Sequence, residues 1–254
     1  MQDKLRFVPR RGFSLPSLIM SADINCYHFW YLFRMFIISV FVVASLIRLS
    51  SAWNATFLPL GDSITYGYLS TDGNGYREDL LELITAGGNS VDYIGSIQAG
   101  TMADNWNDGY IGCTIDQIAS SGIPALKMVP QVVLLMAGTN DINYQEDLAN
   151  APTRLMNLVD EIFSYSPNAA VIVSDIPLIV DDTLEPLVET YNSGIQVLLQ
   201  ERISEGQHVV HVTLSDLTSS EMADDLHPND EGYQVLAQAW DVGIQTASAA
   251  GWIA

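Results

Sequence analysis

The fold is decided by the stretch Leu58-Pro59-Leu60-Gly61-Asp62-Ser63-Ile64-Thr65-Tyr66-Gly67, in which a short apolar run stops at a Gly-Asp-Ser turn. The apolar segment 55–60 is too short for a helix, which favours a β-strand. Gly61 permits the sharp turn that a strand needs in order to pass into a helix or loop. The stretch therefore predicts a strand that carries Ser63 at its carboxyl end, where open α/β sheets bind ligands. Taken alone, such a turn more often only bonds nearby backbone amides, so the rest of the chain must decide.

Apolar runs and amphipathic segments alternate along the chain after this strand. Strands are expected at 55–60, 91–94, 131–136, 169–173 and 208–212. Helices are expected at 76–86, 114–119, 152–165, 184–203 (with a gap at Gly194) and 230–247, and a long polar and aromatic loop at 98–112. Strands that alternate with helices at this spacing predict a single domain with a right-handed, doubly wound parallel sheet.

The first 52 residues differ from the rest, since they hold six of the ten basic residues and two of the thirty acidic ones. A largely apolar run at 35–47 follows Arg34 and precedes Ser50-Ser51-Ala52, an order typical of a secretory signal peptide that is cleaved after Ala52. We therefore expect an N-terminal extension and signal peptide at 1–52, a folded domain at 53–254, and secretion. A signal anchor is the alternative, which Arg34 disfavours. Met35 would begin a signal peptide of normal proportions, so the start at Met1 or Met35 stays open.

Removal of this leader would leave four basic and 28 acidic side chains, a formal charge of −24. Such a surface repels nucleic acid and anionic membranes, so neither nucleic-acid binding nor stable membrane association is expected. A neutral polymer or a small ester is compatible with the charge, which is equally typical of a soluble secreted protein. The only cysteine left would be Cys113, expected to be a small buried residue without a disulfide. A monomer is expected.

A second chemical stretch, Asp224-Asp225-Leu226-His227-Pro228-Asn229, lies between the last expected strand and the last expected helix. Pro228 fixes the backbone after His227 and Asn229 can cap the helix, so the histidine is expected on a rigid loop at the rim of the sheet. Asp224 can reach an imidazole nitrogen from the same turn and fix its tautomer. A metal site is not expected, because no second histidine lies in a comparable loop.

Asn140 follows another expected buried strand. Because the carboxyl ends of parallel strands meet at one edge of a sheet, Ser63, Asn140 and the pair Asp224 and His227 can converge. Together they supply an alcohol, an amide donor, an orienting carboxylate and a base, the groups that nucleophilic acyl transfer requires.

Four sequence blocks in this order resemble those of the SGNH hydrolases of the GDSL esterase group. They are Gly61-Asp62-Ser63-Ile64-Thr65, Gly109-Tyr110-Ile111-Gly112, Gly138-Thr139-Asn140-Asp141 and Asp224-Asp225-Leu226-His227-Pro228. The resemblance spans 55–247 and implies a three-layer α/β/α domain with a mainly parallel, about five-stranded, flavodoxin-like sheet. The absence of a Gly-x-Ser-x-Gly elbow argues against an α/β-hydrolase.

The resemblance also implies a chemistry. Ser63, His227 and Asp224 would form a catalytic triad, and the amides of Ser63 and Gly112 with the side chain of Asn140 would form the oxyanion hole. Neither a cofactor nor a metal is implied.

Further segments, among them Gly75-Tyr76-Arg77 and Val91-Asp92-Tyr93-Ile94-Gly95-Ser96, resemble the secreted carbohydrate esterases of family 3 that deacetylate xylan. The implied substrate is an acetylated polysaccharide or oligosaccharide, or a small ester. Two alternatives remain open. One is a GDSL lipase, lysophospholipase or thioesterase that prefers longer acyl chains, and the other is a non-catalytic carbohydrate-binding protein.

Candidate substrate contacts are less specific than the triad. Tyr66, Tyr68, Trp106 and Tyr110 are close in sequence to the expected site and offer flat surfaces on which sugar rings stack, although each is equally typical of core or loop packing. The chain departs from the family pattern at Asp225, at Cys113 and at Asn107-Asp108, where a small residue, an aromatic residue and a His-Glu pair are common. These departures concern the expected substrate contacts.

Overall fold

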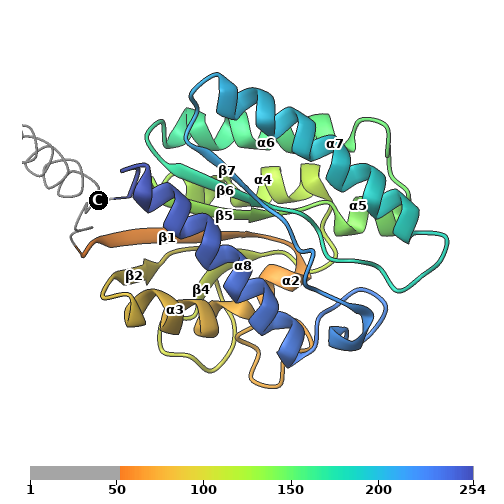
Figure 1. The fold of residues 1–254 in the computed structure, drawn as a ribbon, viewed down its shortest axis with the longest axis horizontal. Coiled ribbons are helices and arrows are strands. Elements are labelled where there is room, and N and C mark those ends of the chain that lie inside the picture. The colour runs from red at the N-terminus through yellow and green to blue at the C-terminus, as the bar shows by residue number, and fades with distance from the viewer. Residues whose placement is uncertain (1–51, 254) are drawn as a thin grey trace, which may run out of the picture. The chain divides into compact units, whose positions relative to one another are not determined.

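The computed structural model describes residues 52–253, which form a mostly parallel sheet of seven strands between two layers of helices (Figure 1). The strands are β1 (Asn54–Gly61), β2 (Ser90–Tyr93), β3 (Ile97–Gln98), β4 (Trp106–Gly109), β5 (Val132–Met136), β6 (Ala170–Ser174) and β7 (Val209–Val212). The helices are α2 (Ser63–Tyr66), α3 (Tyr76–Ala86), α4 (Ile115–Leu126), α5 (Thr139–Tyr144), α6 (Ala151–Tyr165), α7 (Glu185–Ser204) and α8 (Asp230–Ala249), with a 3-10 turn η1 (Ser219–Glu221). The expected signal peptide and its cleavage site lie outside or at the very start of the described residues.

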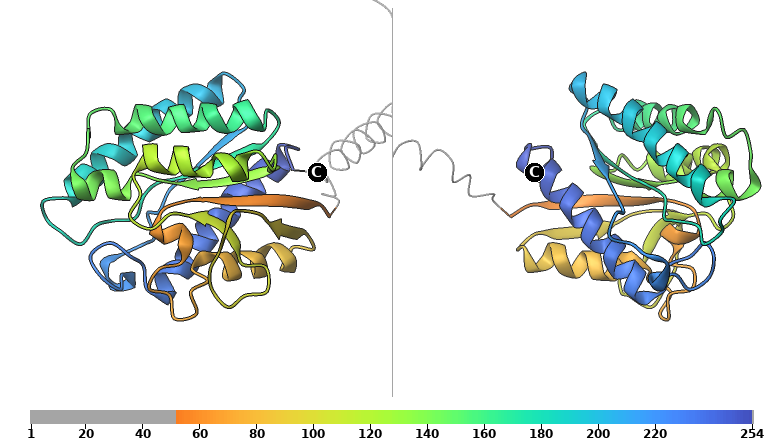
Figure 2. Two further views of the ribbon diagram at one scale, coloured as in Figure 1. Left: turned by 180° about the vertical axis from the view of Figure 1, so that it is seen from behind. Right: turned by 45° about the vertical axis from the view of Figure 1, so that its right-hand side comes forward.

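The strand order is β3-β4-β1-β5-β6-β7, and β2 also pairs with β1. β2 runs beside the first half of β1, whereas β4 runs beside its last two residues, so the two strands share one position of the sheet. The parallel part of the sheet therefore has five positions, occupied in order by β2 with β4, β1, β5, β6 and β7. When these positions are numbered along the chain, their order is 2-1-3-4-5, the flavodoxin-like order, which confirms the expected fold class. Helices α3 and α8 cover one face, and α4, α6 and α7 cover the other (Figures 1 and 2).

The central strands are buried on both faces, as their continuous apolar sequences predict. Every residue of β5 and of β6 is buried. The expected gap in α7 at Gly194 is wrong, because the helix runs through this residue. Gly194 packs closely on α6: a Cβ atom there would come within 2.9 Å of the Pro152 ring, so a larger residue would not fit. Helix α4 likewise extends past the expected end at 119, with Gly122 in contact with Leu60.

The expected loop 98–112 is wrong in its middle, where β4 forms. Its residues Asn107 and Asp108 are fully buried, which an apolar-periodicity argument does not anticipate. Asp108 accepts hydrogen bonds from the backbone and hydroxyl of Ser96, at 2.6 and 2.8 Å, and from the Tyr110 hydroxyl at 2.7 Å. The buried carboxylate is thus satisfied, so Asn107 and Asp108 belong to the packing of the sheet and not to a substrate-facing surface.

Candidate active site

Strand β1 delivers Ser63 to the carboxyl edge of the sheet. Gly61, its last residue, pairs with Gly109 of β4 on one side and with Met136 of β5 on the other. A Cβ atom at Gly61 would lie 2.3 Å from the Met136 carbonyl oxygen, so only glycine fits this corner. Asp62 then caps the short helix α2 by accepting the Ile64 amide at 3.0 Å, which places Ser63 at the first helical position.

A chain of hydrogen bonds joins Ser63, His227 and Asp224. The distance from Ser63 Oγ to His227 Nε2 is 2.9 Å, and that from His227 Nδ1 to Asp224 Oδ2 is also 2.9 Å. Asp224 Oδ1 accepts the backbone amides of Leu226 and His227 at 2.8 and 2.7 Å, which ties the carboxylate to its own loop. The structure therefore brings together the three residues that the sequence suggested for a triad.

The orienting carboxylate lies at the surface. The Asp224 side chain is 44% exposed, against 12% for His227. Partial burial alone would raise the pKa of Asp224, but the hydrogen bonds from His227 and the two backbone amides outweigh it and lower the pKa. Asp224 is thus an ionised acceptor that can hold His227 Nδ1 protonated and Nε2 free to take the Ser63 proton.

The loops after β4 and β5 emerge on either side of Ser63 and carry the expected oxyanion donors. Gly112 has a left-handed φ of 75°, and Asn140 lies in α5. Among residues 52–253, neither the Ser63 amide nor the Gly112 amide donates to another protein group. One Asn140 amide proton is donated to the Cys113 carbonyl at 3.0 Å, which fixes the orientation of the side chain and leaves its second proton available.

Residues 60–235 match the GDSL-like Lipase/Acylhydrolase family, from β1 into α8. The chain belongs to this family. The match includes every residue of the Ser63, His227 and Asp224 relay and the candidate oxyanion donors. The expected class, a carboxylic ester hydrolase, is confirmed at the level of the family.

Individual relatives and solved structures agree with the family. A multidomain esterase of Ruminococcus flavefaciens is 28% identical over an alignment of 226 positions, and the match covers 76% of this chain and 29% of that protein. The chain spans less than half of the length of the curated relatives that it matches. The family 3 carbohydrate esterase of Clostridium thermocellum is 31% identical, with a TM-score of 0.67 over 76% of this chain and 99% of the other. A carbohydrate esterase family 3 structure from Talaromyces cellulolyticus, at 23% identity, covers 77% of this chain and 98% of its own and shares the fold with a TM-score of 0.67.

The four aromatic candidates of this GDSL-family chain occupy different surroundings. The Tyr68 ring contacts the His227 ring, with centroids 4.8 Å apart. Tyr66 is half-buried in α2, and the Tyr110 hydroxyl lies within 2.7 Å of both the Asp108 carboxylate and a carbonyl of α4, so it braces the sheet. Trp106 is 40% exposed at the amino end of β4, whereas Ser63 follows the carboxyl end of the neighbouring strand. The structure thus brings Tyr68 to the relay and places Trp106 toward the opposite end of its strand.

Two residues at the site were not anticipated from the sequence. Tyr144 lies one helical turn after Asn140 on α5, is 56% exposed, and has its hydroxyl 3.4 Å from the Gly112 carbonyl oxygen. Ile111, beside Gly112, is also exposed. Tyr144 follows Asn140 by four residues, a spacing that brings side chains to one face of a helix, but the sequence does not indicate a helix at 139–144. Cys113, expected to be buried, is half-buried, and its partial burial raises the pKa of the thiol.

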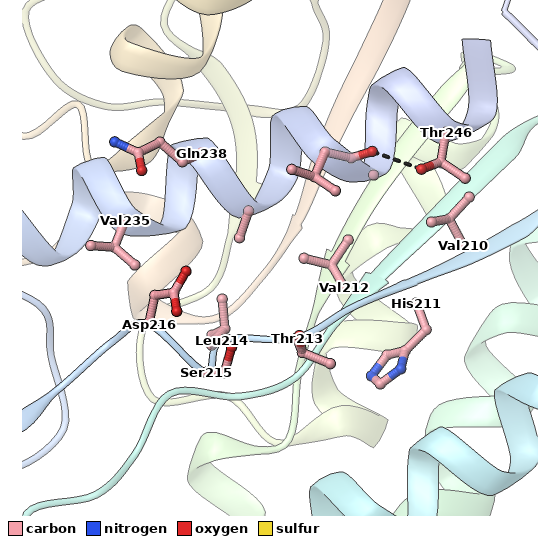
Figure 3. Close-up of a pocket in the computed structure, with 13 residues that line it drawn as sticks. Val210, His211, Val212, Thr213, Leu214, Ser215, Asp216, Val235, Gln238 and Thr246 are labelled. Carbon is pink, nitrogen blue, oxygen red and sulfur yellow. Dashed lines mark hydrogen bonds between the residues drawn. The ribbon is translucent and has the colours of Figure 1, made fainter. Parts of the chain in front are cut away.

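A separate pocket lies between the edge strand β7 and helix α8 (Figure 3). Its volume is about 360 Å³, and its walls include Val210, Val212 and Val242. None of the proposed site residues lines it. Its histidine, His211, is paired with Asp175 at 2.7 Å, so this pocket has no nucleophile and base arranged like the relay.

Asp62 is a buried carboxyl group directly before the nucleophile. Its side chain is fully buried, and its Oδ2 atom has no hydrogen-bond partner among residues 52–253. Burial raises the pKa of Asp62 to about 6, in spite of the hydrogen bond from the Ile64 amide. In the unfolded chain the pKa returns to about 3.9, so folding favours the protonated carboxyl. The contribution of Asp62 to the free energy of unfolding is therefore fully present at low pH and is lost as the pH rises from about 4 to about 6.

Replacement of Asp62 by asparagine is expected to stabilise the protein at pH 7 to 8 but not at pH 4. Asparagine keeps the acceptor for the Ile64 amide and removes the ionisation, which costs on the order of 3 kcal/mol at neutral pH. Urea unfolding of both proteins between pH 4 and pH 8 measures the difference. Asp181→Asn is a control of opposite sign, because the hydrogen bonds of Thr183 lower the pKa of the exposed Asp181. If the difference in the free energy of unfolding between wild type and Asp62→Asn did not change with pH, the pKa of Asp62 would not be raised in the folded protein.

Proposed function

We propose that this chain is a secreted serine esterase that removes acetyl groups from carbohydrate, with acetylated xylan or related acetyl-sugars as substrate. The observation that carries the proposal is the hydrogen-bonded relay from Ser63 through His227 to Asp224 at the carboxyl edge of the sheet. Membership of the GDSL-like family supports the ester chemistry. The similarity to a family 3 carbohydrate esterase, at 31% identity over nearly all of that chain, supports the substrate class.

The proposed mechanism follows the geometry of the relay. His227 Nε2 takes the proton of Ser63 as Oγ attacks the ester carbonyl, while Asp224 stabilises the imidazolium. The amides of Ser63 and Gly112 and the side chain of Asn140 receive the negative charge of the tetrahedral intermediate. The carbon–oxygen bond to the sugar then breaks, and His227 gives its proton to the leaving alcohol. Water, deprotonated by His227, hydrolyses the acetyl-enzyme to acetate and restores Ser63.

The proposed location rests on the leader sequence. The first described strand begins at Asn54, two residues after the expected cleavage site, so cleavage there would leave every described strand and helix intact. None of the helices between residues 52 and 253 combines the length and hydropathy of a membrane span. The acidic composition supports a neutral carbohydrate or a small ester as the substrate, over an anionic lipid or a nucleic acid. The protein is proposed to act as a monomer.

A longer acyl chain is the second candidate, because exposed apolar side chains adjoin the site. Ile111 and Tyr144 flank Gly112, and Leu69 follows Tyr68; these three side chains are 53%, 56% and 45% exposed. Such a rim would suit a lipase or thioesterase as well as a sugar ring. A non-catalytic carbohydrate-binding protein would have no need of a serine and a histidine at hydrogen-bond distance.

The two candidates differ in their expected chain-length preference. We expect the purified protein to hydrolyse 4-nitrophenyl acetate faster than the butyrate and far faster than the octanoate, and to release acetate from acetylated xylan. The Ser63→Ala variant serves as the blank in every assay. A preference for octanoate would replace the proposal by a lipase. Activity of the Ser63→Ala variant equal to that of wild type would remove the proposed site altogether.

A further inference from the structure

Tyr68 touches the imidazole of His227. The two ring centroids are 4.8 Å apart and the ring planes meet at 62°, an edge-to-face contact. The Tyr68 side chain is 42% exposed, and its hydroxyl has no hydrogen-bond partner among residues 52–253. The contact therefore involves the aromatic ring and not the hydroxyl group.

His227 needs a second support because its carboxylate partner is exposed. A hydrogen bond to a side chain that is nearly half exposed competes with water and holds an imidazole ring less firmly than a buried one. His227 is itself only 12% exposed, so other groups cover most of its ring. Tyr68 is one of these groups, because its ring packs against the imidazole, and it comes from the segment that carries Ser63.

The backbone of Tyr68 is fixed at both ends. Its amide donates to the carbonyl oxygen of Ser63 at 3.0 Å, and its carbonyl accepts the Tyr233 hydroxyl at 2.7 Å. Tyr233 lies in α8, is 1% exposed, and packs so closely that a Cβ atom at Gly75 would come within 3.3 Å of its ring. Through these bonds the position of the Tyr68 ring depends on both the nucleophile and the helix that follows the histidine loop.

We propose that Tyr68 is a positioning residue for the catalytic base, and that Tyr233 is the anchor that holds Tyr68 in place. The ring keeps the imidazole in the orientation that faces Ser63 Oγ. This inference rests on the proposed function, and it replaces a sugar-stacking role for Tyr68 by a role in the chemical step.

The test uses a substrate and an inhibitor that have neither a sugar nor an aromatic ring. For Tyr68→Ala, we expect kcat on ethyl acetate to fall about 10- to 100-fold with KM unchanged, the usual cost of a misplaced catalytic group. The rate at which methanesulfonyl fluoride inactivates the enzyme should fall in parallel. Tyr68→Phe should retain the wild-type kcat, because it keeps the ring. Tyr233→Phe should lower kcat about 3- to 10-fold, the equivalent of one neutral hydrogen bond.

Tyr93→Phe is the matched control for Tyr233→Phe. The Tyr93 hydroxyl is also buried and also donates to a backbone carbonyl, that of Arg77 at 3.0 Å, but Tyr93 forms no hydrogen bond with Ser63, His227, Asp224 or Tyr68 among the described residues. Both variants should lose similar stability to urea, and only Tyr233→Phe should lose turnover. Equal turnover in the two variants would overturn the anchoring role of Tyr233.

The remaining outcomes separate the inference from the function on which it rests. If Tyr68→Ala raised KM for acetylated xylo-oligosaccharides but left kcat on ethyl acetate and the inactivation rate unchanged, Tyr68 would be a substrate contact only. If the wild-type enzyme hydrolysed no ester and did not react with methanesulfonyl fluoride, the proposed function and the inference would fail together.

Discussion

The His227→Ala variant is expected to lose about 10⁴- to 10⁶-fold in kcat on 4-nitrophenyl acetate, with little change in KM. His227 Nε2 is the group that accepts the Ser63 proton, at 2.9 Å. Asp62, the residue before Ser63, cannot replace the imidazole, because its side chain is fully buried and its Oδ1 atom accepts the Ile64 amide. Steady-state kinetics with the urea-unfolding midpoint as a folding check measure the effect. A variant that kept more than a few per cent of wild-type kcat would show that another group is the base.

Asp224→Asn is the informative partner of this variant. Asparagine retains an oxygen for the backbone amides of Leu226 and His227, but its amide group favours the wrong imidazole tautomer. In a buried triad that change costs about 10⁴-fold in kcat. Here the Asp224 carboxylate is 44% exposed, so water already solvates its charge and its interaction with the imidazolium is weaker; we therefore expect a loss of only about 10²-fold. A loss as large as that of His227→Ala would mean that exposure of the carboxylate does not weaken its role.

The residues of the relay were predictable from the sequence because each lies at a point where the chain is forced to turn. Gly61 ends a short apolar run directly before Ser63, and Pro228 follows His227 between a strand and a helix. Parallel topology then brings such turns to one edge, whatever the details of packing. The fold class follows from the same alternation, and the family match agrees with it.

The surroundings of the relay were not predictable, for two physical reasons. The contact of Tyr68 with His227 joins segments far apart in the chain, and periodicity carries no information about such a pair. Tyr144 reaches the site through the six-residue helix α5, which is too short to produce a periodic pattern. Strand β4 was missed because it buries Asn107 and Asp108 instead of apolar side chains.

Arg77→Met is expected to lower the free energy of unfolding by about 3 to 5 kcal/mol, because each buried acceptor that loses its donor costs about 1 to 3 kcal/mol. The Arg77 side chain is fully buried, and none of the ion pairs among residues 52–253 includes it. Its partners are backbone carbonyls instead: Nη2 donates to Tyr66, Gly73 and Ala99 at 3.0 to 3.1 Å, and Nη1 donates to Asn105 at 3.1 Å. Methionine fills similar space but leaves the carbonyl oxygens of Tyr66, Gly73 and Ala99 without a donor; the Asn105 oxygen also accepts the Ala99 amide at 3.1 Å and keeps that bond.

The network also links stability to the site. The Tyr66 carbonyl belongs to α2, the helix that begins at Ser63, so any folded Arg77→Met enzyme should also have a reduced kcat. Urea unfolding measures the stability, and Arg77→Lys, which restores some donors, should recover part of it if Arg77→Met does not fold.

Arg202→Met provides the matched control. Arg202 forms a bidentate pair with Asp160, whose side chain is 54% exposed, and surface pairs of this kind contribute about 1 kcal/mol or less. If Arg77→Met cost no more stability than Arg202→Met, the hydrogen bonds of Arg77 to the carbonyls of Tyr66, Gly73 and Ala99 would not be needed for the stability of the fold. We expect Arg77→Met to lose more stability than Arg202→Met because the buried Arg77 guanidinium donates to four backbone carbonyls, whereas the ion pair of Arg202 is with one exposed carboxylate.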